Sequence, residues 1–373
     1  MKTLPSLNLV LAAALSVPVS ARAVAVSTQG AAAPSVPGAG PDIVFPQPPD
    51  KPRIRFVRSI QTANDLKPKT EKKAGGFFAK IVAFFSGGER IVEMFNNPYG
   101  IWRRADKIYV SDTGAQHLVV VDLKAASFSY LGDKGEESLK SPVGVAVDEA
   151  DNVYVSDTGD GSIKAYAPDG RMMWKSEGAG GAAGRLNRPA GITITPAGEL
   201  LVADSSNRRI VALAKDGRFL KEMCLHANKE YFALPNPNNV WSLKNGEFLV
   251  SDPLAARVHI FSSTGAAVGG FGEPGDSAGY MSRPRGVAVD SDGNIHVVDA
   301  MFNRVQVFNR KGDVLVWYGG PGSQPGNMAL PAGIFIDEND LIYLANSKLR
   351  RIDIFQYITY PEDKITVPKK GKK

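Results

Sequence analysis

Polar side chains that could bind a metal ion or take part in catalysis recur along this chain at a nearly constant spacing. Acidic or amide side chains end six short apolar segments, at Asp112, Asp157, Asp204, Asp252, Asp299 and Asn346. Carboxylates gathered around one axis would be able to bind a hard metal ion. Each of these residues, however, precedes a turn and belongs to a separate repeat, and carboxylates in such places commonly accept hydrogen bonds from backbone N–H groups. We therefore expect them to stabilise loops rather than to share a metal ion.

A second charged series follows five positions after the first. It consists of Arg209, Arg257, Arg304 and Arg351, and the first two repeats carry His117 and Ser162 instead. A guanidinium group donates several hydrogen bonds in a fixed geometry. We expect these arginines to bridge loops between neighbouring repeats.

Histidine and cysteine are too scarce to build a metal centre. The chain has four histidines and one cysteine, Cys224, which excludes an intramolecular disulfide and a cysteine-based zinc site. By alignment of the repeats, His296 is expected to pack in a core, and His259 is expected to face solvent. Only His117 and His226 fall in expected loops, and two histidines are too few for a histidine-based metal site. We expect no catalytic residue, no bound metal and no cofactor.

A sequence repeat places all of these residues. Six copies each begin with a proline-containing turn. Their prolines, 44 to 48 residues apart, are Pro98, Pro142, Pro189, Pro237, Pro284 and Pro331. The fifth copy reads as four short strands over 286–290, 295–299, 304–308 and 313–319, separated by Asp/Gly/Asn turns. Four antiparallel strands about every 40 to 50 residues are typical of propeller blades. The sequence therefore predicts an all-β fold, a six-bladed β-propeller of four-stranded antiparallel blades.

Two stretches of the fifth copy resemble the NHL-repeat family. They are Pro284-Arg285-Gly286-Val287-Ala288-Val289-Asp290 and Asp299-Ala300-Met301-Phe302-Asn303-Arg304-Val305. The first follows the family pattern P-x-G-I/V-x-I/V-D, and the resemblance covers about 97 to 357. It implies six blades that start near residues 97, 141, 188, 236, 283 and 330.

The sixth copy lacks a fourth strand of its own, because no glycine-led strand follows Phe355. The segment IRFVRSI at 54–60, ahead of the first copy, has the composition of a strand. We expect residues 53–60 to fill the outer position of the sixth blade. The ring would then close non-covalently between the two ends of the chain, without an open edge.

The start of the chain reads as an export signal. Lys2 precedes a 13-residue apolar stretch over 7–19, and small-residue cleavage signals follow, so that residues 1–25 are a predicted signal peptide. The stretch is shorter than the roughly 20 residues of an ordinary membrane span, and an uncleaved N-terminal anchor is the alternative. Residues 26–52 are rich in Pro, Ala and Gly and are expected to form a linker. We expect a periplasmic or secreted protein of an exported bacterial type, and not a lipoprotein.

The distribution of charge excludes one class of partner. The formal net charge is +6, but residues 97–357 hold 27 Lys and Arg against 30 Asp and Glu. The excess of basic residues therefore belongs to the ends, which include the basic tail 358–373. Because the repeats carry no basic surplus, we expect no nucleic acid among the partners.

A long insert over 61–96 separates the closing strand from the first blade, and it exceeds the usual length of a loop. An amphipathic helix is predicted over 77–85. Its apolar side consists of Phe77, Phe78, Ile81, Val82, Phe84 and Phe85. A helix this short needs a surface on which to dock. Two alternatives stay open, a lid on the propeller's own loops and a peripheral membrane contact, because lysines precede the helix and basic residues suit anionic lipid.

Enzymes among similar propellers use residues that this chain lacks. NHL-like lyases that amidate peptides use several histidines around a central metal, and gluconolactonase-like propellers bind a metal with carboxylate and amide groups near the channel. The expected innermost strands here carry no acid before their final residue. Both enzymatic interpretations therefore lose their essential residues, and a non-enzymatic role is favoured.

In a propeller, the loops between blades and the loops after the second strands emerge on one face. Here that face carries arginine, methionine and aromatic side chains, which are enriched in protein contacts. The candidate partner-binding residues are Arg188, Asn238, Trp241, Arg283, Arg285, Met301, Phe302 and His117. We expect an exported non-enzymatic scaffold that binds another envelope or extracellular protein, or a polymer, through this face. The alternative is a ligand-binding or catalytic propeller, lyase-like or lactonase-like, that acts on a small polar molecule at the channel mouth.

Overall fold

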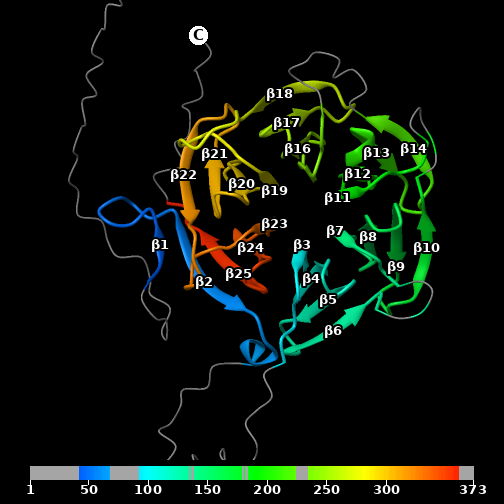
Figure 1. The fold of residues 1–373 in the computed structure, drawn as a ribbon, viewed down its shortest axis with the longest axis horizontal. Helices are drawn as coiled ribbons and strands as arrows, with labels where there is room; N and C mark the ends of the chain where they lie inside the picture. The colour runs from blue at the N-terminus through cyan, green and yellow to red at the C-terminus, as the bar shows by residue number, and fades with distance from the viewer. Residues whose placement is uncertain are drawn as a thin grey trace, which may run out of the picture. The chain divides into compact units, whose positions relative to one another are not determined.

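The described part of the chain is an all-β ring. The structure is a computed structural model that describes residues 42–67 and 92–360, apart from 134, 136–137, 179, 181–183 and 224–233. Six antiparallel sheets follow one another around a central axis (Figure 1). The predicted six-bladed β-propeller with four-stranded antiparallel blades is therefore confirmed, and the sixth sheet carries one additional short strand.

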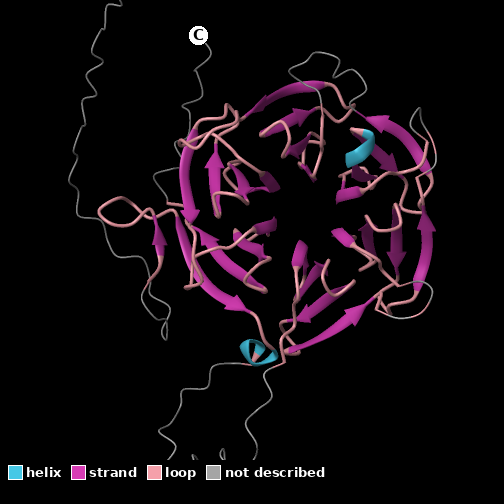
Figure 2. Cartoon of the chain, viewed as in Figure 1, coloured by secondary structure: helices cyan, strands magenta, loops and turns pink. Residues whose placement is uncertain are grey.

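Each blade begins with an inner strand beside the central axis and continues outward (Figure 2). The innermost strands are β3 (Pro98–Arg104), β7 (Pro142–Val147), β11 (Pro189–Ile194), β15 (Asn239–Ser242), β19 (Pro284–Val289) and β23 (Pro331–Ile336). The second strands are β4 (Lys107–Asp112), β8 (Val153–Asp157), β12 (Leu200–Asp204), β16 (Phe248–Asp252), β20 (Ile295–Asp299) and β24 (Leu341–Asn346).

Two further strands complete each blade. The third strands are β5 (His117–Asp122), β9 (Ser162–Tyr166), β13 (Arg209–Leu213), β17 (Arg257–Phe261), β21 (Arg304–Phe308) and β25 (Arg351–Tyr357). The outer strands are β6 (Ser127–Leu131), β10 (Met172–Ser176), β14 (Phe219–Met223), β18 (Ala267–Phe271), β22 (Val314–Gly319) and, for the sixth blade, β2 (Ile54–Ile60).

The hydrophobic core lies between the blades. Val258 of β17 and Val287 of β19 share one apolar cluster, although they belong to the fourth and fifth blades. In the same way, Ile101 of β3 and Ala345 of β24 join the first and sixth blades. Because each sheet is packed on both sides, the second strands are buried along nearly their whole length.

Neighbouring inner strands approach each other closely, which requires glycine near their start. A Cβ atom at Gly100 would collide with the carbonyl oxygen of Val143 in the next blade. The same carbonyl accepts a hydrogen bond of 2.6 Å from the hydroxyl of Ser111. The fourth blade has Asn239 where other blades have glycine, and its inner strand pairs without the register shift found in β3. This departure of the fourth repeat is therefore matched by a different backbone path.

The ring closes between the two ends of the described chain. β2 pairs antiparallel with β25, which supplies the third strand of the sixth blade. Ile54 and Ile60, at the two ends of β2, are fully buried, and the hydroxyl of Ser59 donates a hydrogen bond of 2.5 Å to Asp353. The segment 54–60 thus takes the outer position of the sixth blade, where the sequence places a closing strand.

The structure differs from the expected linker at one point. The short strand β1 (Val44–Phe45) lies within 26–52 and pairs with β2 as a fifth strand of the sixth sheet. Val44 is buried, and the ring of Phe45 lies 6.3 Å from the ring of Tyr318 in the fifth blade. The composition of the segment as a whole concealed this pair of apolar residues, which gain from burial against the ring.

Several predicted segments lie outside the described residues. They are the signal peptide 1–25, the first part of the linker, the helix over 77–85 and the tail beyond 360. Within the described residues the helices are of the 3-10 type, η1 (Ala63–Leu66) and η2 (Ser205–Asn207). No helix in that part of the chain has the length and apolar character needed to cross a membrane.

His259 corrects the prediction that its position faces solvent. Only 1% of the residue is exposed, and Gln306 and Asp353 at the equivalent positions are fully buried as well. Alternation along one strand did not reveal this burial, because both sides of a blade are covered. Neither ring nitrogen of His259 has a hydrogen-bond partner among the described residues. Burial, assisted by the positive charge of Arg257, lowers the pKa of His259 from 6.5 to about 4.

Truncating a buried residue of the closing strand should weaken the whole ring. Ile60 is fully buried, whereas Val57 on the same strand is 47% exposed. We expect Ile60→Ala to lower the free energy of unfolding by about 3 kcal/mol, because it leaves a cavity in the core. Val57→Ala should change it by roughly 0.5 kcal/mol or less. Urea unfolding followed by circular dichroism measures both, and equal stabilities of the two variants would contradict this role of β2.

The buried neutral His259 should make the protein less stable in acid. The imidazole binds a proton near pH 6.5 in the unfolded chain but only near pH 4 in the folded chain. Stability that is present above pH 6.5 is therefore lost as the pH falls from 6.5 to 4, by about 3 kcal/mol at pH 4. His259→Gln, which copies Gln306 of the fifth blade, removes the titrating group. Urea unfolding at pH 7 and pH 4 measures how much the free energy of unfolding falls in acid, and this fall should be about 3 kcal/mol smaller in the variant. The same fall in the parent and the variant would contradict the assignment to His259.

Candidate functional site

Two sets of loops meet on one face of the propeller. The backbone N–H of Thr113, after the second strand of the first blade, donates to the carbonyl of Asn97 at 3.1 Å. In the fifth blade, Ala300 donates to Arg283 at the same distance. We call this surface the loop face; it consists of the connections between blades and the turns that follow the second strands.

The repeated aspartates hold these loops together. Asp112 is fully buried and accepts hydrogen bonds from the backbone N–H groups of Asn96 and Asn97 at 2.6 and 2.8 Å. Asp157 accepts from Ser141 in the same way and also binds the ammonium group of Lys164 at 2.7 Å. Within the described ranges, no group of three or more His, Cys, Asp or Glu side chains is arranged to hold a metal ion. The aspartates therefore serve the structure of the loops.

Three arginines of the second series bind carbonyl groups of the connections between blades. Arg209 donates to the carbonyl of Gly184 at 2.8 Å, and Arg257 donates to that of Gly272, directly after β18, at 3.2 Å. Arg351 donates to three carbonyls in the connection that leads into the sixth blade, at Ser323, Gln324 and Asn327. These contacts agree with the expected bridging of loops.

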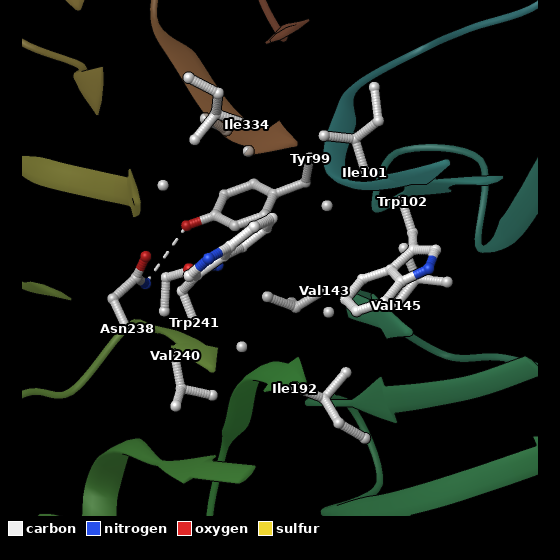
Figure 3. Close-up of a pocket in the computed structure, with 17 residues that line it drawn as sticks. Tyr99, Ile101, Trp102, Val143, Val145, Ile192, Asn238, Val240, Trp241 and Ile334 are labelled. Atoms are coloured by element: carbon white, nitrogen blue, oxygen red, sulfur yellow. Dashed lines mark hydrogen bonds between the residues drawn. The ribbon is translucent and has the colours of Figure 1, made fainter. Parts of the chain in front are cut away.

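Side chains from the inner strands fill the central channel. Trp102 of β3, Trp241 of β15 and Phe335 of β23 form an aromatic plug, with ring centroids 5.1 to 6.4 Å apart. The remaining cavity has a volume of about 30 Å³, and Tyr99 and Ile334 are among the residues that line it (Figure 3). A cavity of this size holds one or two water molecules. The channel itself is therefore too full for a sugar-sized molecule.

Polar groups lie at the mouth of the channel on the loop-face side, where β3 begins. The side-chain amide of Asn238 donates a hydrogen bond of 3.3 Å to the hydroxyl of Tyr99 across the axis (Figure 3). The guanidinium of Arg285 lies over the ring of Tyr99, 5.4 Å from its centroid. These groups come from the first, fourth and fifth blades and offer hydrogen-bond donors and one positive charge to a ligand above them.

The structure separates the candidate residues of the inner strands. Trp241 lies in the aromatic plug, and Asn238 and Arg285 lie at the channel mouth. Arg188 and Arg283 are exposed on the loop face, each directly before the proline of its repeat. Two of the candidate arginines are thus exposed on the loop face, while Asn238, Trp241 and Arg285 lie close to the central axis.

The remaining candidates lie where second strands end and third strands begin. Met301 is 53% exposed, and the ring of Phe302 lies 4.8 Å from the guanidinium of Arg304. His117 was expected in a loop but is the first residue of β5, and its ring lies 4.3 Å from that of Tyr130. Burial lowers the pKa of His117.

Sequence reasoning missed Tyr99, Trp102 and Phe335. Trp102 and Phe335 stand at the fifth position of an inner strand, where the second and fifth blades carry Ala146 and Ala288. Tyr99 stands at the second position, where the third and sixth blades carry alanine. A large side chain at a position that is small elsewhere in the repeat was the available signal.

Comparisons with known proteins agree with this architecture. The model described as NHL repeat matches residues 186–213. No curated protein matches the sequence. Virginiamycin B lyase from Staphylococcus aureus is similar in structure, with 15% identity, a TM-score of 0.52, and 70% of this chain and 96% of that chain covered. A gluconolactonase from Xanthomonas campestris is also similar in structure, with 16% identity and a TM-score of 0.55. The match covers 71% of this chain and 87% of that chain.

An auxiliary nutrient binding protein from Bacteroides thetaiotaomicron is also similar, with 12% identity, a TM-score of 0.56, and 71% of this chain and 70% of that chain covered. At such identities the likeness shows the fold and not the activity. The repeat match and the six sheets together identify the chain as a six-bladed β-propeller that carries an NHL repeat.

Proposed function

We propose that this protein is a non-enzymatic scaffold that binds another protein through its loop face. The observation that carries the proposal is the contrast between the centre and the face of the ring. The aromatic plug fills the channel except for a cavity of about 30 Å³, whereas the loops around the channel present exposed side chains. With the export signal predicted over 1–25, the partner that we propose is another envelope or extracellular protein.

The composition of the face supports a protein partner. Besides Met301, the loops expose the apolar side chains of Leu254, Tyr280 and Leu330. These residues come from the turn after β16 and from the connections into the fifth and sixth blades. Together with the neighbouring Arg283 they form the mixture of apolar and arginine side chains that protein interfaces favour.

A second candidate function rests on the channel mouth. Tyr99, Asn238 and Arg285 converge there, and such a group suits a small polar or anionic molecule that sits above the plug. The similar solved structures include a lyase and a gluconolactonase. Binding or conversion of a small polar molecule at this mouth is therefore the alternative proposal.

Photo-crosslinking in native cells tests the main proposal. A photoreactive amino acid replaces Arg283 or Met301 on the loop face, and the matched control replaces Lys311, an exposed residue in the β21–β22 turn on the opposite side of the same blade. We expect one discrete protein adduct from both loop-face positions and none from Lys311. Adducts of equal yield from all three positions, or none from the loop face, would contradict the proposal.

The alternative predicts a different response. An Arg285→Ala variant should then lose a thermal stabilisation that small molecules extracted from the envelope fraction give to the parent protein, because a bound ligand stabilises only the folded state. If the extract leaves the melting temperature of the parent unchanged, the channel mouth is not a small-molecule site.

A further inference from the structure

Arg304 differs from the other arginines of its series. Its Nε and Nη2 atoms are buried, and neither has a hydrogen-bond partner among the described residues. The guanidinium lies over two aromatic rings, 4.8 Å from the centroid of Phe302 and 5.8 Å from that of Trp317. We call Phe302, Arg304 and Trp317 the blade-five cluster.

The sixth blade shows what this position normally does. The connections that lead into the fifth and sixth blades follow the same path, since each is closed by a bridge between a proline and a methionine, Pro274 with Met281 and Pro321 with Met328. Arg351 donates to three carbonyls of its connection. Arg304 makes no such contact in the described structure, and Gln306 binds the connection instead, through the carbonyl of Tyr280 at 2.8 Å. The guanidinium of Arg304 is therefore not needed to hold its loop.

The third blade shows which group is missing. There the equivalent arginine, Arg209, binds two carboxylates, those of Asp204 and Glu222. Glu222 pairs in the sheet with the second residue after Arg209, and Trp317 pairs with the second residue after Arg304. Trp317 thus occupies in the fifth blade the strand position that Glu222 occupies in the third. An indole has replaced the carboxylate that completes the ion pair.

No carboxylate of the described chain supplies the lost partner. Asp299, the counterpart of Asp204, accepts from the backbone N–H groups of Ser282 and Arg283 and forms no ion pair with Arg304. Glu273 and Asp276 in the adjacent connection are exposed and form no ion pair with it either. A partly buried cation without a hydrogen-bonded anion is unfavourable, and the two aromatic faces compensate only in part. An incoming carboxylate would form an ion pair with Arg304, as Glu222 does with Arg209.

We propose that the blade-five cluster binds a carboxylate side chain of a partner polypeptide. This inference rests on the proposed function, because it names the group that the partner brings to the loop face. Two exposed side chains favour a polypeptide, since Trp317 of the cluster is 49% exposed and Met301, next to Phe302 in the chain, is 53% exposed. They offer apolar contact to the residues that flank the acid, and both arginine and tryptophan are enriched at the energetic centres of protein interfaces. The planar guanidinium carries N–H donors in a fork that matches a carboxylate, and binding requires the exposed Trp317 ring to move so that the buried Nη2 atom becomes accessible.

A pair of model peptides tests the chemistry directly. One is an acetylated, amidated pentapeptide with a single glutamate between leucines, and the other has glutamine in its place. Nuclear magnetic resonance follows the Nε–H signal of Arg304 and the indole signal of Trp317, with the indole signal of Trp174 in the second blade as internal control. We expect the glutamate peptide to shift the first two signals with an affinity about tenfold higher than the glutamine peptide. Equal responses to the two peptides, or no response to either, would overturn the proposal.

A matched variant separates the cluster from the fold. Arg304→Ser copies Ser162, the residue at this position in the second blade, so that the repeat itself provides the precedent for folding. The Trp317 signal of this variant should lose the tenfold preference for the glutamate peptide. A preference that persists in the variant would show that another group binds the acid and would refute the inference.

The same variant distinguishes failure of this inference from failure of the proposed function. If the photo-crosslink from position 283 forms in the parent and is lost in Arg304→Ser, the cluster is the anchor of the partner. If it persists undiminished in the variant, the loop face binds the partner but the cluster does not anchor it, which overturns the inference alone. If the parent forms no crosslink while the glutamate peptide binds selectively, the proposed function fails and the carboxylate site stands.

Discussion

The pairing of β2 with β25 is the interaction on which the rest of the structure depends. The hydrophobic core lies between blades, so each blade is stable only when both of its neighbours are in place. The seam between the last and first blades is joined by a hydrogen bond of 2.6 Å from Ser347 to the carbonyl of Pro98 and by an ion pair of 2.9 Å between Arg103 and Asp337. Both contacts come from a sixth blade whose outer strand is supplied by the other end of the chain. Closure therefore fixes the loops of all six blades relative to one another.

A closed ring with a filled channel leaves the loop face as the surface on which the repeats are free to differ. In each blade the first residue of the third strand pairs with the last residue of the second strand, but its side chain differs between blades. In the third blade Arg209 is completed by Glu222, whereas in the fifth blade Arg304 faces the indole of Trp317. Since the scaffold does not require these differences, we interpret them as consequences of binding.

The sequence was sufficient for the architecture because the repeat reports it directly. The regular prolines and the alternating segments predicted six four-stranded blades, and those sheets are present. Burial between blades was harder to predict. His259 reads as an exposed position along its own strand, but a blade has no solvent-facing side there. The sequence predicts Trp241 on the partner-binding face, yet its contact with Trp102 joins blades on opposite sides of the axis, which one strand cannot reveal. The unpaired state of Arg304 became visible only by comparing the residues that face it in different blades.

Hydroxyl-radical footprinting in living cells would test the central claim that the loop face around the fifth blade is covered by a partner. Methionine and tryptophan react rapidly with such radicals, and the isolated chain exposes Met301 and Trp317 there, with Met173 on the outer strand of the second blade as an exposed reference. The labelling of each residue is compared between the purified protein and the protein in its native cells. Our account predicts that labelling of Met301 and Trp317 falls in cells while that of Met173 is unchanged. Equal labelling of Met301 and Trp317 in the two settings would contradict it.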